Sequence, residues 1–478
     1  MSKPKQLSLI DIYSDCSDLL ENDKPRFLSL LEDHISLEDY IQPSFYNHFY
    51  LATGRKRTYH LTSFLWALLL QRIFTIPTDT LLITFLKFSK ELRDFCGFTK
   101  VPDTSKFTRF KQDFLLDLQS FFDSLVDVTE PICQFIDTNL ASMTIFDTSG
   151  IEAYVTENNP KYANKLIRQL KSYKKTMKYD DSYDPYRAAY ASMPSHAATN
   201  TEIKQLYING HFCYVYKCGV ITNGLGIIRH IALYNKAFSN SHNESFTDKK
   251  STSPDNDKSI GDNTALIPTL TDFFKAHPLI TPKTFLGDSA FDAVETYRSL
   301  FQDFHFDKAY IPLNKRGGLV GNDITYDELG RPLCPKDGSL PLVCEGNTKI
   351  KGGTPALKWV CPKTKWIGHS RRCFCDNPCT SSKSGRMTYT YPERDYRLYP
   401  GVARGDEKWN KTYKIRSVVE QCINHFKENL CVANRKTQNI TTTHADLLLA
   451  GITQLFTVIL ADKIHKHEYL RSLKPLIA

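Results

Sequence analysis

The sequence contains no apolar run long enough to cross a lipid bilayer. Its two most apolar stretches are residues 64–76 and 447–461, and polar residues interrupt both of them. A transmembrane helix needs about 20 mostly apolar residues, so we expect both stretches to form buried helices. The N-terminal segment MSKPKQLSLIDIYSDCSD lacks an apolar stretch suited to a secretory signal. These absences predict a cytoplasmic protein without a membrane partner.

Glycine and proline are not abundant either, with 22 and 23 of 478 residues, and charged residues make up 24%. This composition excludes collagen-like and disordered chains, and the length predicts about two to four domains. Lysine and arginine number 61 against 52 acidic residues, a net charge of +9. A mild basic excess favours a polyanionic partner such as nucleic acid, although a slightly basic enzyme explains it equally well.

The order of helical and strand patterns predicts an α/β protein. An all-α pattern in the first part of the chain is followed by short apolar strands that alternate with helices, which predicts a mixed sheet flanked by helices. A Cys-rich stretch then precedes a late helix at about 407–430. The expected segments are a polar leader at 1–40, a helical domain at 41–135, the first part of the core at 140–316, the Cys-rich insertion at 317–395, the rest of the core at 396–435 and a C-terminal helix at 436–478.

Three acidic residues occupy positions suited to metal-dependent chemistry. Asp147 lies in the expected strand MTIFDTSGIEAYV, and Asp288 follows an expected strand in KTFLGDSAFD. Ligands of α/β sheets gather at the carboxyl ends of strands, where Glu420 on the late helix could join the two aspartates. Carboxylate oxygens suit Mg²⁺ or Mn²⁺. Each acid taken singly is more often a cap or a surface residue, and Asp292 either caps the next helix or joins the set.

The late helix carries a polar stripe formed by Tyr413, Arg416, Glu420 and Lys427. On an ideal α-helix these four residues fall within an arc of about 60°, and the apolar residues occupy the adjoining arc. The helix can therefore pack on a sheet while the stripe projects from its side. A surface pair of Arg416 and Glu420 would explain two of the four residues but not the others.

In residue type and spacing, this stripe resembles the Y-R-E-K signature of bacterial insertion-sequence DDE transposases. The motifs FDTSG around Asp147 and LGDSAFD around Asp288 agree with that family in position and order, and the resemblance spans about residues 40–465. It implies an RNase H-like catalytic core, an all-α N-terminal DNA-binding domain and a Cys-rich insertion before the last catalytic helix.

The resemblance also implies the chemistry. Asp147, Asp288 and Glu420 would hold two Mg²⁺ or Mn²⁺ ions, and the other three stripe residues would contact DNA phosphates. Hydrolysis of a phosphodiester at the transposon end would free a 3′-OH, which would then attack target DNA. The expected partner is double-stranded DNA, bound by a homodimer in the cytoplasm at the nucleoid. The alternatives are a catalytically inactive DNA-binding descendant and an RNase H-fold nuclease without strand transfer.

A basic segment at 161–178 offers a second DNA contact. It contains seven basic residues and no acid, with tyrosines interleaved, and we expect Lys171, Lys174 and Lys175 to contact DNA. A solvated helix face is an equally good explanation of the pattern.

Thirteen cysteines are many for a chain without a secretory signal, and six of them lie between Cys334 and Cys379. Four thiolates could hold a structural Zn²⁺ ion in a segment with little apolar core. The spacing lacks paired CxxC knuckles, so free thiols remain an alternative. The candidate zinc ligands are Cys344, Cys361, Cys373, Cys375 and Cys379.

Overall fold

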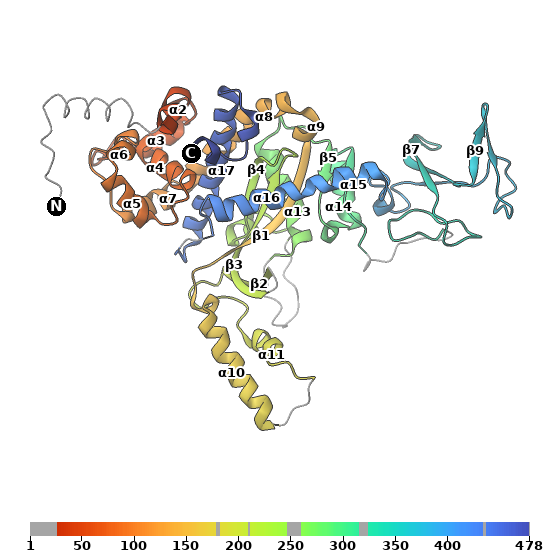
Figure 1. The fold of residues 1–478 in the computed structure, drawn as a ribbon, viewed down its shortest axis with the longest axis horizontal. Coiled ribbons are helices and arrows are strands. Elements are labelled where there is room, and N and C mark those ends of the chain that lie inside the picture. Colours follow the sequence, from red (N-terminus) through yellow and green to blue (C-terminus); the bar gives the residue numbers. More distant parts are fainter. Residues whose placement is uncertain are drawn as a thin grey trace, which may run out of the picture. The chain divides into compact units, whose positions relative to one another are not determined.

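A computed structural model describes residues 26–177, 182–208, 211–245, 260–314, 324–433 and 436–477 (Figure 1). The chain divides into two compact units. The first combines the part up to Ile132 with the part from His425 onward, and the second runs from Cys133 to Asn424. The protein mixes helices and sheet, as the α/β prediction required.

The first unit is helical, and its core contains two apolar helices, α4 (Leu61–Ile73) and α17 (Ile440–Lys463). Among the described residues α17 is the one helix long and apolar enough to cross a membrane, but 94% of its most apolar stretch is buried inside the protein. The two apolar stretches of the sequence therefore form core helices, as expected. The other helices of this unit are α2 (Arg26–His34), α3 (Pro43–Phe49), α5 (Asp79–Phe88), α6 (Lys90–Phe95), α7 (Thr104–Asp113), most of α8 (Leu115–Ile136) and α18 (Lys474–Ile477).

Several of these helices start at a residue whose side chain caps the helix, α5 and α7 among them. The hydroxyl of Thr78 accepts a hydrogen bond from the backbone N–H of Leu81 at the start of α5. The carboxylate of Asp103 accepts one from Lys106 at the start of α7. Each cap satisfies an N–H group that the first turn of a helix leaves without a partner. These short polar residues therefore fix where the helices begin.

A buried ionic cluster connects four helices of the first unit. The guanidinium of Arg72 on α4 lies 2.7 Å from the carboxylate of Asp446 on α17. The ammonium of Lys111 on α7 lies 3.0 Å from both Asp446 and Asp79, the first residue of α5. The side chains of Arg72, Lys111 and Asp446 are at most 2% exposed. Because removing one member would leave an uncompensated buried charge, these residues constrain how the helices pack.

The second unit is built on a six-stranded mixed sheet in the order β2-β3-β1-β5-β6, with β4 paired to the other end of β3. The long central strands β1 and β3 run antiparallel, whereas β5 and β6 continue parallel to β1. The carboxyl ends of β1, β5 and β6 therefore point the same way. The strands are β1 (Met143–Glu152), β2 (Lys204–Ile208), β3 (His211–Thr222), β4 (Ile228–Leu233), β5 (Thr284–Leu286) and β6 (Lys308–Tyr310).

An apolar core packs on one face of this sheet. Phe146 in β1 and Phe285 in β5 pack with Leu266 and Leu270 of α13 (Asp262–Ala276). Side chains alternate between faces along a strand, so Asp147, next to Phe146, points to the opposite face. Helix α16 (Ser417–Asn424) packs against β1 and β3. Asp147 therefore lies on the face of the sheet that adjoins α16, the helix that carries Glu420.

Between β6 and this helix, the Cys-rich segment forms small antiparallel sheets. Three strands pair in the order β11-β8-β7, and β9 and β10 form a separate hairpin. A small apolar cluster that includes Leu342, Leu357 and Trp359 lies under the larger sheet. The strands are β7 (Val343–Lys349), β8 (Pro355–Val360), β9 (Thr364–Ile367), β10 (Ser370–Cys373) and β11 (Met387–Thr390).

Candidate active site

Asp147 lies in the middle of β1, opposite Val220 of β3. One carboxylate oxygen accepts a hydrogen bond of 2.8 Å from the backbone N–H of Thr148. The side chain is 23% exposed, so it is largely withdrawn from water but still reachable. A strand carboxylate in this position has few solvent molecules to stabilise its charge and depends on its neighbours.

Asp288 lies just past the end of β5, the strand parallel and adjacent to β1. Its carboxylate accepts a hydrogen bond of 2.6 Å from the backbone N–H of Ser289 and caps a short 3₁₀ turn, Ser289–Phe291. The side chain is exposed. The turn aims the residue outward from the carboxyl edge of the sheet, where ligands of such sheets bind.

The helical segment that carries Glu420 is not one regular helix. It begins with α15 (Glu407–Tyr413), tightens into a 3₁₀ turn at Lys414–Arg416 and continues as α16. Asp406 caps its start by accepting a hydrogen bond from the backbone N–H of Trp409. The apolar residues of α16, Val419 and Cys422 among them, are buried. Glu420 is consequently held on the polar side of an anchored helix.

Arg416 connects two of the three acids. Its Nη1 lies 3.4 Å from Oδ2 of Asp147, and its Nη2 donates to Oε1 of Glu420. The guanidinium is 18% exposed, whereas the Glu420 side chain is 48% exposed. A single cation thus neutralises a strand carboxylate and a helix carboxylate at the same time.

The pKa of Asp147 is shifted by burial and by the same neighbouring charges. Burial raises the pKa of Asp147 to about 6, while Arg416 and the Thr148 N–H oppose the rise and the charges of Glu420 and Asp288 add to it. All three acids are therefore close enough to interact electrostatically. A carboxylate whose pKa is raised by burial and by like charges is a common property of catalytic and metal sites.

Tyr413 belongs to this group as well. Burial raises the pKa of its hydroxyl, a hydrogen bond to Arg416 lowers it, and the charges of Asp288 and Glu420 raise it. The Tyr413 ring stacks on Trp409, with ring centroids 4.8 Å apart. The structure thus brings together five residues that the sequence singled out: Asp147, Asp288, Tyr413, Arg416 and Glu420.

The donor set of this site consists of oxygens, which suits a hard divalent cation. Within the described ranges, however, no group of three or more His, Cys, Asp or Glu residues is arranged around one common metal position. At the carboxylates it is the guanidinium of Arg416 that pairs with Asp147 and Glu420. The oxygen donors thus suit a divalent metal in their chemistry. In their present arrangement, however, the guanidinium of Arg416 occupies the contacts of two of the acids, and it would have to yield part of them to a metal.

Two other residues of the same region have separate positions. Lys427 lies in a π-helical turn, His425–Asn429, that belongs to the first unit, so its place in the stripe stays a prediction. Asp292 does not cap the following helix, which starts after Ala293. Its carboxylate accepts hydrogen bonds from the hydroxyl of Tyr297 and the backbone N–H of Asn314. The expected cap was wrong because a buried network holds Asp292 instead.

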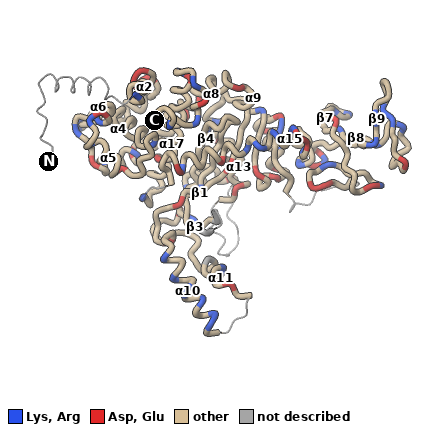
Figure 2. Tube along the Cα trace, viewed as in Figure 1, with Lys and Arg blue, Asp and Glu red and all other residues tan. Residues whose placement is uncertain are grey.

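Basic residues recur along the length of helix α10 (Pro160–Met177) (Figure 2). Lys171 donates to the hydroxyl of Tyr186 on α11 (Pro185–Ser192), and Lys174 donates to the carbonyl of Tyr183. Lys171 and Lys175 are exposed, and Lys174 is partly exposed. Lys171 therefore also links α10 to α11, and Lys174 bonds the residues just before α11. The contact of the three lysines with DNA stays a prediction.

The cysteines of the insertion converge in part. The thiols of Cys334 and Cys379 form a hydrogen bond with each other. The pKa of Cys361 is raised by burial and also by the charges of Cys373, Cys334 and Cys375, so these thiols lie near it. Cys344 packs instead against the apolar cluster under β8. Cys334 was not among the zinc ligands predicted from the sequence, although the Cys-Pro-Lys triplet at 334–336, repeated at 361–363, pointed to it.

The helical unit provides independent evidence of function. Residues 15–113 match the family described as Transposase domain (DUF772). This match supports a transposase. It covers roughly a fifth of the chain and none of the five site residues, so it does not depend on them. No curated protein matches the sequence. A transposase is an enzyme that cuts and transfers DNA, which makes DNA the partner that the match suggests.

Proposed function

We propose that the protein is a DDE transposase, in which Asp147, Asp288 and Glu420 act at the scissile phosphodiester of transposon DNA. The observation that carries the proposal is the convergence of these acids, from two adjacent strands and a late helix, around Arg416. The transposase-domain match in the other unit agrees with it.

The topology of the sheet supports an RNase H-like core. Strands β4, β3 and β1 are antiparallel neighbours, and β5 and β6 extend the sheet parallel to β1. An RNase H-like sheet has this arrangement, with one acid on the central strand and a second just past the neighbouring parallel strand. Asp147 and Asp288 occupy these two positions.

The side chains of the site divide into two roles. Asp147, Asp288 and Glu420 would hold Mg²⁺ or Mn²⁺, which supplies activation of the attacking hydroxyl and stabilisation of charge on the phosphate. Arg416 suits a bidentate contact to a DNA phosphate, because its planar guanidinium presents paired donors. Tyr413 can donate one hydrogen bond to the same backbone. No side chain has to act as a nucleophile, since water and then a DNA 3′-OH perform the attack.

Cleavage of DNA that flanks the coding region tests this assignment. Purified full-length protein is incubated with end-labelled DNA and a target plasmid, with Mg²⁺ or with EDTA. We expect metal-dependent cleavage and joined products from the wild type and from Glu295→Ala, an exposed acid on the neighbouring helix α14 (Val294–Arg298). Asp288→Asn and Glu420→Gln should fold normally and do neither.

Metal-dependent cleavage by Asp288→Asn at the wild-type rate would remove Asp288 from the triad. Cleavage without joined products would indicate a nuclease instead of a transposase. Binding without cleavage by any of the proteins would favour an inactive DNA-binding descendant.

We also propose a structural zinc ion in the insertion. Cys334 and Cys361 are each followed by Pro-Lys, and each thiol accepts a hydrogen bond from the N–H of the lysine two residues later. Although burial opposes it, the N–H groups of Asp337 and Lys336 keep the pKa of Cys334 below its usual value, whereas burial raises the pKa values of Cys361 and Cys379. The lowered pKa of Cys334 favours the thiolate that zinc requires. The proposed ligands are Cys334, Cys361, Cys379 and one of the pair Cys373 and Cys375.

A further inference from the structure

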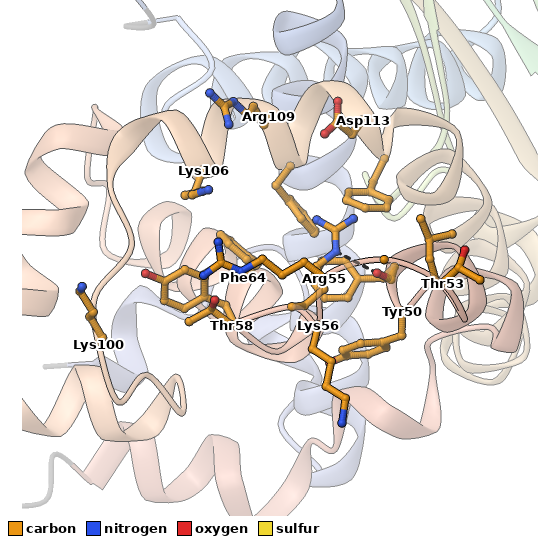
Figure 3. Close-up of a pocket in the computed structure, with 17 residues that line it drawn as sticks. Tyr50, Thr53, Arg55, Lys56, Thr58, Phe64, Lys100, Lys106, Arg109 and Asp113 are labelled. Atoms are coloured by element: carbon orange, nitrogen blue, oxygen red, sulfur yellow. Dashed lines mark hydrogen bonds between the residues drawn. The ribbon is translucent and has the colours of Figure 1, made fainter.

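A cluster of cations lines a cavity of about 930 Å³ in the helical unit (Figure 3). Six basic side chains and one acid, Asp113, surround it. A cavity of this size is far too large for a single inorganic anion and is comparable with sites that enclose an extended ligand. The basic residues are Arg55, Lys56, Arg57, Lys100, Lys106 and Arg109.

The cations come from separate chain segments that border the cavity. Arg55 and Lys56 lie on the loop that connects α3 and α4, whereas Lys106 and Arg109 lie one turn apart on α7 (Figure 3). All four side chains are exposed, and Lys100 before α7 is exposed too. Cations that are spread along a cavity suit a linear polyanion better than a compact one.

Among the described residues none of these five cations forms a salt bridge with a carboxylate, although the charge of Lys106 acts on the nearby Asp103. Lys111, two residues after Arg109 on α7, is the opposite case, because it is buried and paired with Asp79 and Asp446. Exposed cations without carboxylate partners can bind phosphates without first breaking an internal contact. Helix α7 thus carries a buried lysine with a structural role as well as exposed cations that line the cavity.

Arg57 has a different task from its neighbours. Its Nε donates to the carbonyl of Phe49 at 2.9 Å, and its guanidinium lies over the rings of Phe49 and Phe114 at 4.6 and 5.3 Å. These contacts fix the loop onto the aromatic floor of the cavity. Gly54 provides the tight bend before it, at φ +104°, where a side chain would be strained. Arg57 therefore positions the loop that presents Arg55 and Lys56.

We infer that this cavity binds the phosphate backbone of duplex DNA, with Arg55, Lys56, Lys100, Lys106 and Arg109 as the contacts. The inference rests on the proposed function for the identity of the polyanion. It goes beyond that function in assigning a binding surface distant in sequence from the catalytic acids. All the lining residues except Phe114 fall within the transposase-domain match.

The test measures binding of full-length protein to a fluorescein-labelled mixed-sequence DNA duplex over a series of salt concentrations, without divalent metal. For Lys106→Gln/Arg109→Gln we expect about tenfold weaker binding at low salt and a salt slope smaller by about two, because two phosphate contacts are lost. Lys87→Gln/Lys90→Gln is the matched control, since these exposed lysines have the same spacing and do not line the cavity. The control should bind like the wild type.

A variant of opposite sign makes the test sharper. Asp113→Asn removes the single acid of the lining and should tighten binding and steepen its salt dependence. Unchanged binding in both the double variant and Asp113→Asn would overturn the inference. Equal losses in the double variant and its control would also overturn it, because they would show a nonspecific effect of net charge.

Competition separates this inference from other outcomes. Unlabelled duplex should displace the probe, and preferential displacement by single-stranded RNA would overturn the assignment to duplex DNA.

The cleavage assay described under Proposed function distinguishes failure of the cavity proposal from failure of the catalytic proposal. Wild-type DNA binding by the cavity variant together with metal-dependent cleavage would refute the cavity alone. Lost binding in that variant with no cleavage by any protein would refute the catalytic proposal alone.

Discussion

The guanidinium of Arg416 lies 3.4 Å from the carboxylate of Asp147, a residue 269 positions earlier in the chain. The same guanidinium donates to Glu420. A cation therefore already compensates two of the acids proposed to bind metal. Divalent metal must compete with this contact, and a DNA phosphate offers Arg416 an alternative partner. Metal binding and DNA binding are thus expected to favour each other at this site.

Replacing Arg416 with glutamine should tighten metal binding in the absence of DNA. The change removes a positive charge beside Asp147 and Glu420, which should raise Mn²⁺ affinity about tenfold at pH 8. The same variant should bind DNA more weakly, because it loses a phosphate contact. Free Mn²⁺ measured by electron paramagnetic resonance reports the first effect, and fluorescence anisotropy reports the second. Weaker Mn²⁺ binding would show that Arg416 supports the metal site instead of competing with it.

Asp147→Asn should stabilise the protein at neutral pH while removing activity. The pKa of Asp147 in the folded protein, raised by burial to about 6, exceeds its ordinary value of 3.8, so the folded state binds this proton more tightly than the unfolded state does. The contribution of Asp147 to the free energy of unfolding therefore falls as pH rises from about 4 to about 6 and is fully unfavourable above that range. The variant removes a cost of up to about 3 kcal/mol.

Urea denaturation of both proteins at pH 5 and pH 8 measures this effect. The advantage of Asp147→Asn should be larger at pH 8, because at pH 5 the wild-type carboxyl is mostly protonated in the folded state. An advantage of the same size at both pH values would contradict the raised pKa. A variant that is less stable at pH 8 would show that the pairing with Arg416 outweighs burial.

Asp446→Ala should destabilise the helical unit by about 3–5 kcal/mol, because it leaves Arg72 and Lys111 buried with less compensation. Hydrogen exchange of the amides in α4 and α17 is the appropriate measurement, since it reports this unit separately from the sheet. Asp462→Ala on the same helix is the control. That residue is 35% exposed and pairs only at the surface with His467, so its loss should change exchange little. Equal protection in both variants would contradict a structural role for the buried cluster.

Purified protein should contain about one equivalent of zinc. Cys361→Ser and Cys379→Ser should lose most of it, whereas Cys344→Ser should keep it, because Cys344 packs against the apolar cluster. Elemental analysis after removal of loosely bound metal gives the content directly. Less than about half an equivalent in the wild type would argue against the site. Equal retention in all three variants would assign the zinc to other ligands.

Local patterns predicted much of this architecture. The apolar stretches became the buried helices α4 and α17, and the strands around Asp147 and before Asp288 formed where expected. The stripe of Tyr413, Arg416 and Glu420 could be read from helical spacing, because a regular turn fixes which side chains share a face. These features depend on near neighbours in the chain.

Features that depend on distant partners could not be predicted. The pairing of Arg416 with Asp147 and the pairing of Arg72 with Asp446 join segments far apart in the sequence. The segment becomes 3₁₀-helical at Lys414–Arg416 and π-helical at His425–Asn429, which changes the number of residues per turn. A calculation for an ideal α-helix therefore does not predict the direction of the Lys427 side chain. Burial of Lys111 was likewise invisible, since its neighbours on α7 are solvent-exposed cations.

The pairing of Arg72 with Asp446 also has a consequence for biosynthesis. The two residues are 374 positions apart, so α4 leaves the ribosome long before α17 exists. Until α17 is synthesised, the strongly apolar helix α4 and its Arg72 lack their packing partner, so α4 would bind chaperones or aggregate. Copies that stop early would therefore be cleared instead of competing for DNA. Only polypeptides translated as far as α17 can assemble the helical unit.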